Sequence, residues 1–208
     1  MLQELGIVLG KGKKAATLFE TLIPDFWSIK YKNPSEYVRY CWNLYENNPT
    51  KNKDLNGKFF EYVLTTLCIR ENLIPLYLNA KVAFVPNVLF DLMLYSAECG
   101  PICLSLKTSL RERYKQADLE SIALKYVHRK SLCYLITLDQ KEAKNIKNKI
   151  KTGDVIGLND VVICFESEFD ALILNLKKFE LSTPPTVEVI TSNQIVTDEK
   201  IKIFKVIK

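Results

Sequence analysis

The pattern of apolar residues changes near residue 73, and this change constrains the fold more than any other feature of the chain. Before it, apolar positions recur at helical spacing, and after it come short apolar runs separated by Asn, Pro and Gly, which are typical of strands. These runs lie at Leu76–Leu78, Val82–Val85, Val88–Leu94 and Ile102–Leu106. Helices followed by closely spaced strands and further helices predict a sheet with helices packed on it.

The remaining segments complete this architecture. Helices are expected over residues 2–22, 35–45, 54–72, 109–127, 140–150 and 168–179, and further strands over 132–138, 161–165, 187–190 and 201–207. The central order α-β-β-β-α-β predicts an α/β protein with a mixed β-sheet flanked by helices. In a chain of 208 residues without repeats or a low-complexity linker, we expect a helical N-terminal region over residues 1–50 and a main domain over residues 51–208.

Composition indicates a globular protein with a slight excess of positive charge. Hydrophobic residues make up 48% of the chain and charged residues 25%, and the formal net charge is +5. That surplus is compatible with a polyanionic partner, although proteins that never bind nucleic acid are often equally basic. No apolar run approaches the roughly 20 residues of a membrane helix, and the N-terminus lacks the pattern of a signal peptide, so we expect a cytoplasmic protein without membrane association.

Cysteine and histidine usage argues against two common kinds of site. Only Cys99 and Cys103 lie close together, and no second pair at zinc-binding spacing accompanies them. The one histidine, His128, has no partnering motif for a catalytic triad. Any catalysis is therefore expected to depend on carboxylates and lysine.

Asp91 and Lys107 are the strongest candidates for such chemistry. Asp91 lies within an apolar strand, where a carboxylate is costly unless a partner compensates its charge. Lys107 ends the next strand and could supply that partner, and so could a metal ion. The simplest interpretation is a salt bridge between the strands. Glu61, beside the apolar stripe of the third helix, would by itself be read as a solvated helix residue.

The order of these elements resembles the core of the PD-(D/E)XK nucleases: a helix with Glu61, a strand with Asp91, a strand ending in Ser105-Leu106-Lys107, and then a helix. The chain departs from that consensus at Phe90, where the family has proline, and at Ser105, where it has a second acid. Restriction endonucleases of the CCGG-recognising branch share the second departure and take the acid from the following helix. Thirteen residues past Lys107, this sequence has Glu120.

This resemblance implies a type II restriction endonuclease with a restriction-endonuclease-like core. Asp91 and Glu120 would hold Mg²⁺, with Glu61 as an outer or second-site ligand. Lys107 would orient the attacking water, so that these four residues form the catalytic set. The resemblance also implies double-stranded DNA as substrate, a homodimer that reads a palindrome, and a companion DNA methyltransferase.

The triplet Arg111-Glu112-Arg113 follows Lys107 and resembles the recognition element of the same branch. Arginine can bind guanine bidentately and a carboxylate can accept from cytosine, which suits CC and GG half-sites. The same residues also fit a capping box, with Ser109 as N-cap and Glu112 three residues later. One carboxylate does not easily serve both roles.

Two other functions are compatible with the same residues. A repair or structure-selective nuclease would use the same fold, and a non-catalytic DNA-binding protein would keep the fold without a metal site. Substitution of the second acid by Ser105 is compatible with the latter. Glu120 distinguishes them, because only the nuclease hypotheses need its carboxylate.

Overall fold

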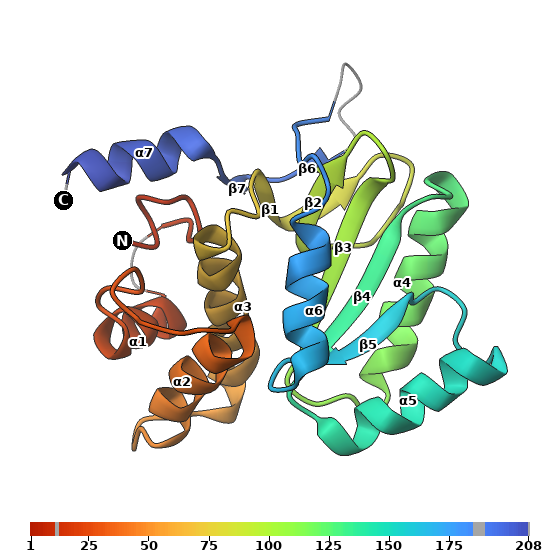
Figure 1. Cartoon of the computed structure of the whole chain (residues 1–208), viewed down its shortest axis with the longest axis horizontal. Helices are drawn as coiled ribbons and strands as arrows, with labels where there is room; N and C mark the ends of the chain where they lie inside the picture. Colours follow the sequence, from red (N-terminus) through yellow and green to blue (C-terminus); the bar gives the residue numbers. More distant parts are fainter. Residues whose placement is uncertain (11–12, 185–189, 208) are drawn as a thin grey trace.

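The computed structural model describes residues 1–10, 13–184 and 190–207, which form a sheet flanked by helices on both faces (Figure 1). The helices are α1 (Lys14–Leu22), α2 (Pro34–Glu46), α3 (Lys53–Arg70), α4 (Arg113–Val127), α5 (Gln140–Thr152), α6 (Ser167–Leu176) and α7 (Asp198–Ile207). The strands are β1 (Leu76–Val82), β2 (Phe90–Ser96), β3 (Gly100–Lys107), β4 (Leu132–Thr137), β5 (Asp160–Ile163), β6 (Ile190–Thr191) and β7 (Gln194–Val196).

The sheet is mixed, as the order of apolar runs predicted. Its strand order is β5-β4-β3-β2-β1-β6, and β7 also pairs with β1. Strand β2 runs antiparallel to both of its neighbours, β1 and β3, whereas β3, β4 and β5 are parallel to one another. Because β2 and β3 are antiparallel, the beginning of β2 lies beside the end of β3. This arrangement brings the segments that contain Asp91 and Lys107 to the same edge of the sheet.

Alternation along the strands divides the core between the two faces of the sheet. On β3, Leu104 and Leu106 belong to the core shared with α3 and α6, whereas Cys103 belongs to the core shared with α4 and α5. Figure 1 shows α6 in front of the sheet and α4 behind it. Side chains at Asp91 and Lys107 have the same parity as Met93 and Cys103, and therefore point towards the α4 side.

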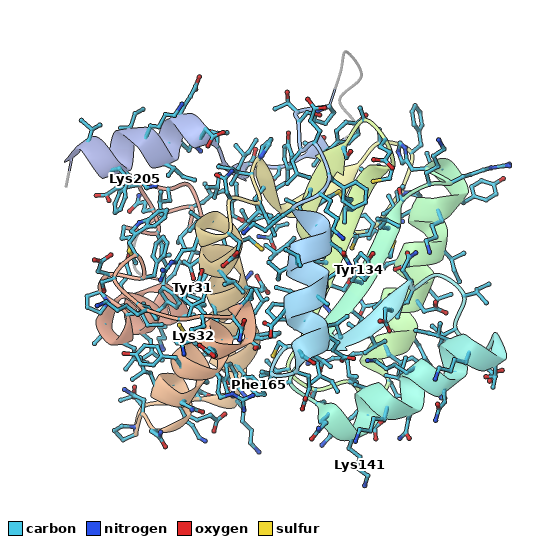
Figure 2. The ribbon with its side chains drawn as sticks, in the orientation of Figure 1. Tyr31, Lys32, Tyr134, Lys141, Phe165 and Lys205 are labelled. Carbon is cyan, nitrogen blue, oxygen red and sulfur yellow. The ribbon has the colours of Figure 1, made fainter. Side chains whose placement is uncertain are left out.

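The aromatic residues of the N-terminal region form a packed core. The rings of Tyr45 and Phe59 stack with centroids 4.3 Å apart, and Phe19 lies 5.4 Å from Phe59. Figure 2 shows Tyr31 within the same helical part of the molecule, where Arg70 lies over its ring. Only Tyr40 among these aromatics is strongly exposed. Core packing, the commoner use of such residues, therefore accounts for them better than stacking on DNA.

Several predicted boundaries were wrong. Residues 201–207, predicted as a strand, belong to α7, since Ile201 and Phe204 are buried one helical turn apart while Lys205 lies over the Trp27 ring. The runs at 76–78 and 82–85 are one strand followed by a turn. Only the last part of the helix predicted over 2–22 forms, as α1, because Gly6 and Gly10 adopt positive φ. Of the strand expected over 187–190, residues 187–189 lie outside the described part of the chain.

All six cysteines are buried free thiols. Burial raises the pKa of Cys41 and of Cys68 to about 12, so these thiols stay protonated at neutral pH. They act as small apolar residues of the core. In the described part of the chain, no helix combines the length and apolarity that crossing a bilayer requires.

Candidate active site

Asp91 and Lys107 meet where strands β2 and β3 separate. The last residue pair between these strands is Leu92 with Leu104. Beyond it, the backbone N–H of Leu106 donates to Asp91 Oδ2 at 2.8 Å, and Lys107 Nζ donates to the same oxygen at 2.8 Å. The carboxylate thus accepts a backbone N–H at the point where pairing with β2 ends, and it fixes the lysine beside the opening between the strands.

This ion pair is largely withdrawn from solvent. The side chains of Asp91 and Lys107 are 19% and 16% exposed. Charge-assisted hydrogen bonds of this length are among the stronger ones in proteins, and partial burial reduces screening by salt. The salt bridge that the sequence allowed is therefore present, on an edge of the sheet that solvent still reaches.

Glu61 approaches the pair from α3, on the other face of the sheet. Its side chain is 18% exposed and forms an ion pair with Lys58 one turn earlier. Burial raises the pKa of Glu61, and the negative charge of Asp91 adds to this, whereas Lys58 and Lys107 act in the opposite direction. Glu61 therefore interacts electrostatically with both Asp91 and Lys107. It is not the solvated helix residue that its local sequence suggested.

Glu120 approaches from α4, on the face towards which Asp91 and Lys107 point. The neighbouring positions Ala117 and Leu124 on its helical stripe are fully buried, while Arg113 at the start of the stripe is exposed. Glu120 Oε1 accepts from Gln116 Nε2 at 2.7 Å. Burial raises the pKa of Glu120, and the charges of Lys107 and Asp91 act on it with opposite signs.

Asp118 fixes the position of α4, and sequence reasoning missed it. Its buried carboxylate accepts from the backbone N–H of Gly157 at 2.6 Å and of Leu158 at 3.3 Å. A Cβ atom at Gly157 would lie 2.3 Å from the Asp118 carbonyl oxygen and 2.7 Å from the Ile122 nitrogen. The helix and the loop before β5 thus touch backbone to backbone. This contact holds the segment from which Glu120 projects.

The donor set suits a hard divalent cation in kind. Mg²⁺ prefers a few carboxylate oxygens with water and phosphate oxygens completing an octahedron, and Asp91, Glu61 and Glu120 supply only carboxylates. Within the described residues, however, no three acidic, histidine or cysteine side chains converge closely enough to form a metal cluster. Each glutamate is instead bonded to a neighbour on its own helix, Lys58 or Gln116.

A cavity of about 380 Å³ opens beside Glu61, between the N-terminal segment, α3 and β1. Lys13, Lys14 and Lys58 line it, together with Asn79 and mainly apolar side chains. Glu61 offsets the charge of Lys58, so the positive excess of this cavity comes from Lys13 and Lys14.

The triplet Arg111-Glu112-Arg113 is exposed at the start of α4. The capping-box interpretation was wrong: α4 begins at Arg113, and the side chain of Glu112 makes no capping hydrogen bond. Its side chain is 80% exposed and pairs with Lys115. Burial of Leu110 and the left-handed φ of 34° at Arg111 bend the chain here, which prevents the helix from starting at Ser109.

The lysine-rich helix α5 presents most of its lysines to solvent, and Figure 2 shows Lys141 pointing away from the molecule. Ala143 and Ile146 form its buried side. Two lysines are exceptions: Lys147 pairs with Glu168, and Lys149 Nζ lies 4.6 Å from the centroid of the Tyr114 ring. Lys141, Lys144 and Lys151 are exposed, which is the ordinary arrangement for a charged helix face.

The mixed sheet, with α3 and α6 on one face and α4 and α5 on the other, matches a restriction-endonuclease-like fold, as a similar solved structure shows. A solved structure of the restriction endonuclease PspGI with its substrate DNA is similar to this chain, with a TM-score of 0.50 and 17% sequence identity over 84% of each chain. No family model matches the sequence, and no curated protein matches it. At this level of identity, the likeness concerns the fold.

Proposed function

We propose that this protein is a Mg²⁺-dependent endonuclease that hydrolyses phosphodiester bonds of double-stranded DNA. The observation that carries the proposal is the Asp91–Lys107 pair at the separation of β2 and β3, with Glu61 and Glu120 in its electrostatic field. An acid and a lysine held together at a partly exposed edge of this fold are suited to phosphoryl chemistry. The similar structure of PspGI, described with substrate DNA, supports DNA as the substrate.

Asp91 and Glu120 would hold the metal, and Glu61 would serve as an outer or second-site ligand. When bound, Mg²⁺ would polarise the scissile phosphate and would lower the pKa of a bound water. The ammonium group of Lys107 orients the attacking water and stabilises the negative charge that develops on the phosphate oxygens. Because both donors bond to Oδ2 of Asp91, the other carboxylate oxygen, Oδ1, could hold the metal.

The finer proposal is a type II restriction endonuclease of the CCGG-like branch. Arg111, Glu112 and Arg113 are exposed beside the proposed catalytic edge, where they would contact base edges of CC and GG half-sites. A palindromic target is most simply read by a homodimer. Such an enzyme would work with a companion DNA methyltransferase, with residues 51–208 as the nuclease domain and residues 1–50 as its helical extension.

Incubation of plasmid DNA with and without Mg²⁺, followed by sequencing of the fragment ends, tests this proposal. Cleavage should need the metal and should be lost in Lys107→Ala, whereas the exposed control Lys178→Ala, just after α6, should cut normally. Ends that map to CC and GG half-sites support the restriction-enzyme assignment. Cuts only at A·T sites contradict that specificity, and cuts only at junctions or lesions indicate a structure-selective nuclease.

A non-catalytic DNA-binding protein is the second candidate. The lack of a converged three-donor cluster among the described residues favours it. DNA binding without cleavage in any divalent metal would decide for this candidate and against the endonuclease.

A further inference from the structure

The loop that joins β1 to β2, residues 83–89, presents two large apolar side chains to solvent. Phe84 is 82% exposed and Leu89 is 56% exposed. Between them, Val85 is buried in the same core as Phe90 and anchors the loop to the sheet. Single exposed apolar residues are ordinary, but two on one short anchored loop form a small apolar projection.

The backbone of this loop holds Phe84 in an unfavourable conformation. Phe84 has a φ of 64° and Asn87 a φ of 61°, both in the left-handed region. The N–H of Val85 donates to the carbonyl oxygen of Val82 at 3.1 Å, which closes a four-residue turn with Phe84 as its third residue. Glycine is the residue favoured at that position when φ is positive. The turn therefore holds Phe84 at a positive φ and exposes its apolar ring to water. Both features are unfavourable, and their combination points to a functional use.

The position of the loop suggests what the ring contacts. Leu89 lies two residues before Asp91, and the loop is at the sheet edge where β3 ends at Lys107. The exposed segment Arg111–Arg113 follows β3 at that same edge. Residues 79–90 contain no acidic side chain, and Lys81 lines a depression of about 820 Å³ together with the loop. A polyanion bound at Asp91 would meet the loop without electrostatic repulsion.

We propose that Phe84 inserts between base pairs of the bound duplex, with Leu89 packed beside it, so that the DNA is bent at the catalytic edge. This inference rests on the proposed function, since it requires DNA at the site. Apolar wedges unstack a base step and bend the duplex, and an aromatic face recovers part of the lost stacking. A ring that is rigidly placed before binding loses little conformational freedom when it inserts.

Tryptophan fluorescence of Phe84→Trp tests the insertion. The probe is a short duplex with CC and GG half-sites, in Ca²⁺ under conditions shown on a gel to leave the DNA uncut. We expect quenching on DNA addition and protection from acrylamide. The control Val206→Trp, which places the reporter at an 85% exposed position on α7, should show neither.

A truncation measures the contribution of the ring. Phe84→Ala should weaken binding of the same duplex by about 5- to 150-fold, the range for loss of one base–aromatic stack. The exposed side chain contributes little to the core, so the thermal midpoint should not fall. Leu174→Ala, at a 62% exposed position on α6, should leave DNA binding unchanged.

Three results would overturn the inference. A duplex that binds fully while the fluorescence of the Phe84→Trp variant stays constant excludes insertion and leaves the endonuclease proposal intact. A signal that changes with protein concentration in the absence of DNA assigns the loop to contacts between two copies of the chain. A wild-type protein that neither binds nor cuts DNA removes both proposals together.

Discussion

Removal of Lys107 should show how much the pair at the sheet edge contributes to stability and to catalysis. Lys107→Met keeps the apolar stem but removes one of the two donors that Asp91 has among the described residues and leaves the Leu106 N–H. A hydrogen bond to a charged group contributes about 1.5–3 kcal/mol, and both side chains are less than one-fifth exposed. We therefore expect the free energy of unfolding to fall by about 2 kcal/mol. Asp91→Asn should cost a similar amount, because Lys107 then loses its counter-charge.

A double-mutant cycle isolates the interaction from these separate losses. The double variant lacks both charges, so its destabilisation should be smaller than the sum of the singles, with a coupling of about 1–2 kcal/mol. Urea denaturation provides the four free energies. The exposed pair Lys51–Glu46, with side chains 47% and 40% exposed, is a matched control that should couple by less than about 1 kcal/mol. A coupling below about 0.5 kcal/mol between Asp91 and Lys107 would refute the structural role of this pair.

The same variants test catalysis. Each single substitution should slow cleavage by at least about 10²-fold. The double variant should lose little more, since residues that act as a unit have non-additive effects. Retention of most of the activity in Lys107→Met would remove this lysine from the mechanism.

Three further outcomes follow from the contacts around this pair. Glu120→Ala should abolish Mg²⁺-dependent cleavage while DNA binding survives. The control Gln116→Ala should cut normally. Full activity of Glu120→Ala would contradict the role of Glu120 as the displaced acid. Burial raises the pKa of Glu61 and of Glu120, and a protonated carboxyl group does not bind metal. As the pH is lowered, cleavage at limiting Mg²⁺ should therefore begin to fall while the pH is still above the usual pKa range of carboxyl groups. Saturating Mg²⁺ should move that fall to lower pH, and initial rates that drop identically at both concentrations would argue against metal binding there. Asp118→Ala should lower the free energy of unfolding by about 3 kcal/mol, since two backbone N–H groups lose a charged acceptor. Gly157→Ala, also followed by urea denaturation, should destabilise as well, because the added Cβ would lie 2.3 Å from the Asp118 carbonyl oxygen. Unchanged stability in either variant would show that this contact is not needed.

The central part of the fold could be predicted because local patterns and tertiary structure agree there. Strands β2, β3 and β4 follow apolar runs bounded by turn residues, and antiparallel pairing of β2 and β3 requires Asp91 and Lys107 to approach one another. The proximity of Glu61 and Glu120 could not be worked out from spacing alone. Each glutamate lies on a different face of the sheet, and only the resemblance to a nuclease core suggested that both approach the pair.

Other features depend on contacts that no local pattern reveals. The N-terminus of α4 is set by burial of Leu110 rather than by the Ser109–Glu112 spacing, so a valid local rule gave the wrong boundary. The carboxylate of Asp118 is satisfied by backbone groups 39 and 40 residues away. The periodicity of the last helix is ambiguous, since the alternation of Lys and Ile over residues 200–203 also fits a strand. Packing of Phe204 in the core decides the outcome.

Because the six thiols are buried, their rate of chemical labelling can report local and global unfolding of this protein. A thiol reagent such as a disulfide dye reacts with the thiolate of an accessible sulfur. Here all six thiols are buried, and burial raises the pKa of each. Labelling should therefore track local or global unfolding rather than surface reactivity. Cys103 and Cys133 on β3 and β4 would report the sheet, whereas Cys41 would report the N-terminal helices. Comparison of their labelling rates with and without DNA would show which part of the molecule is stabilised against local unfolding when the substrate binds.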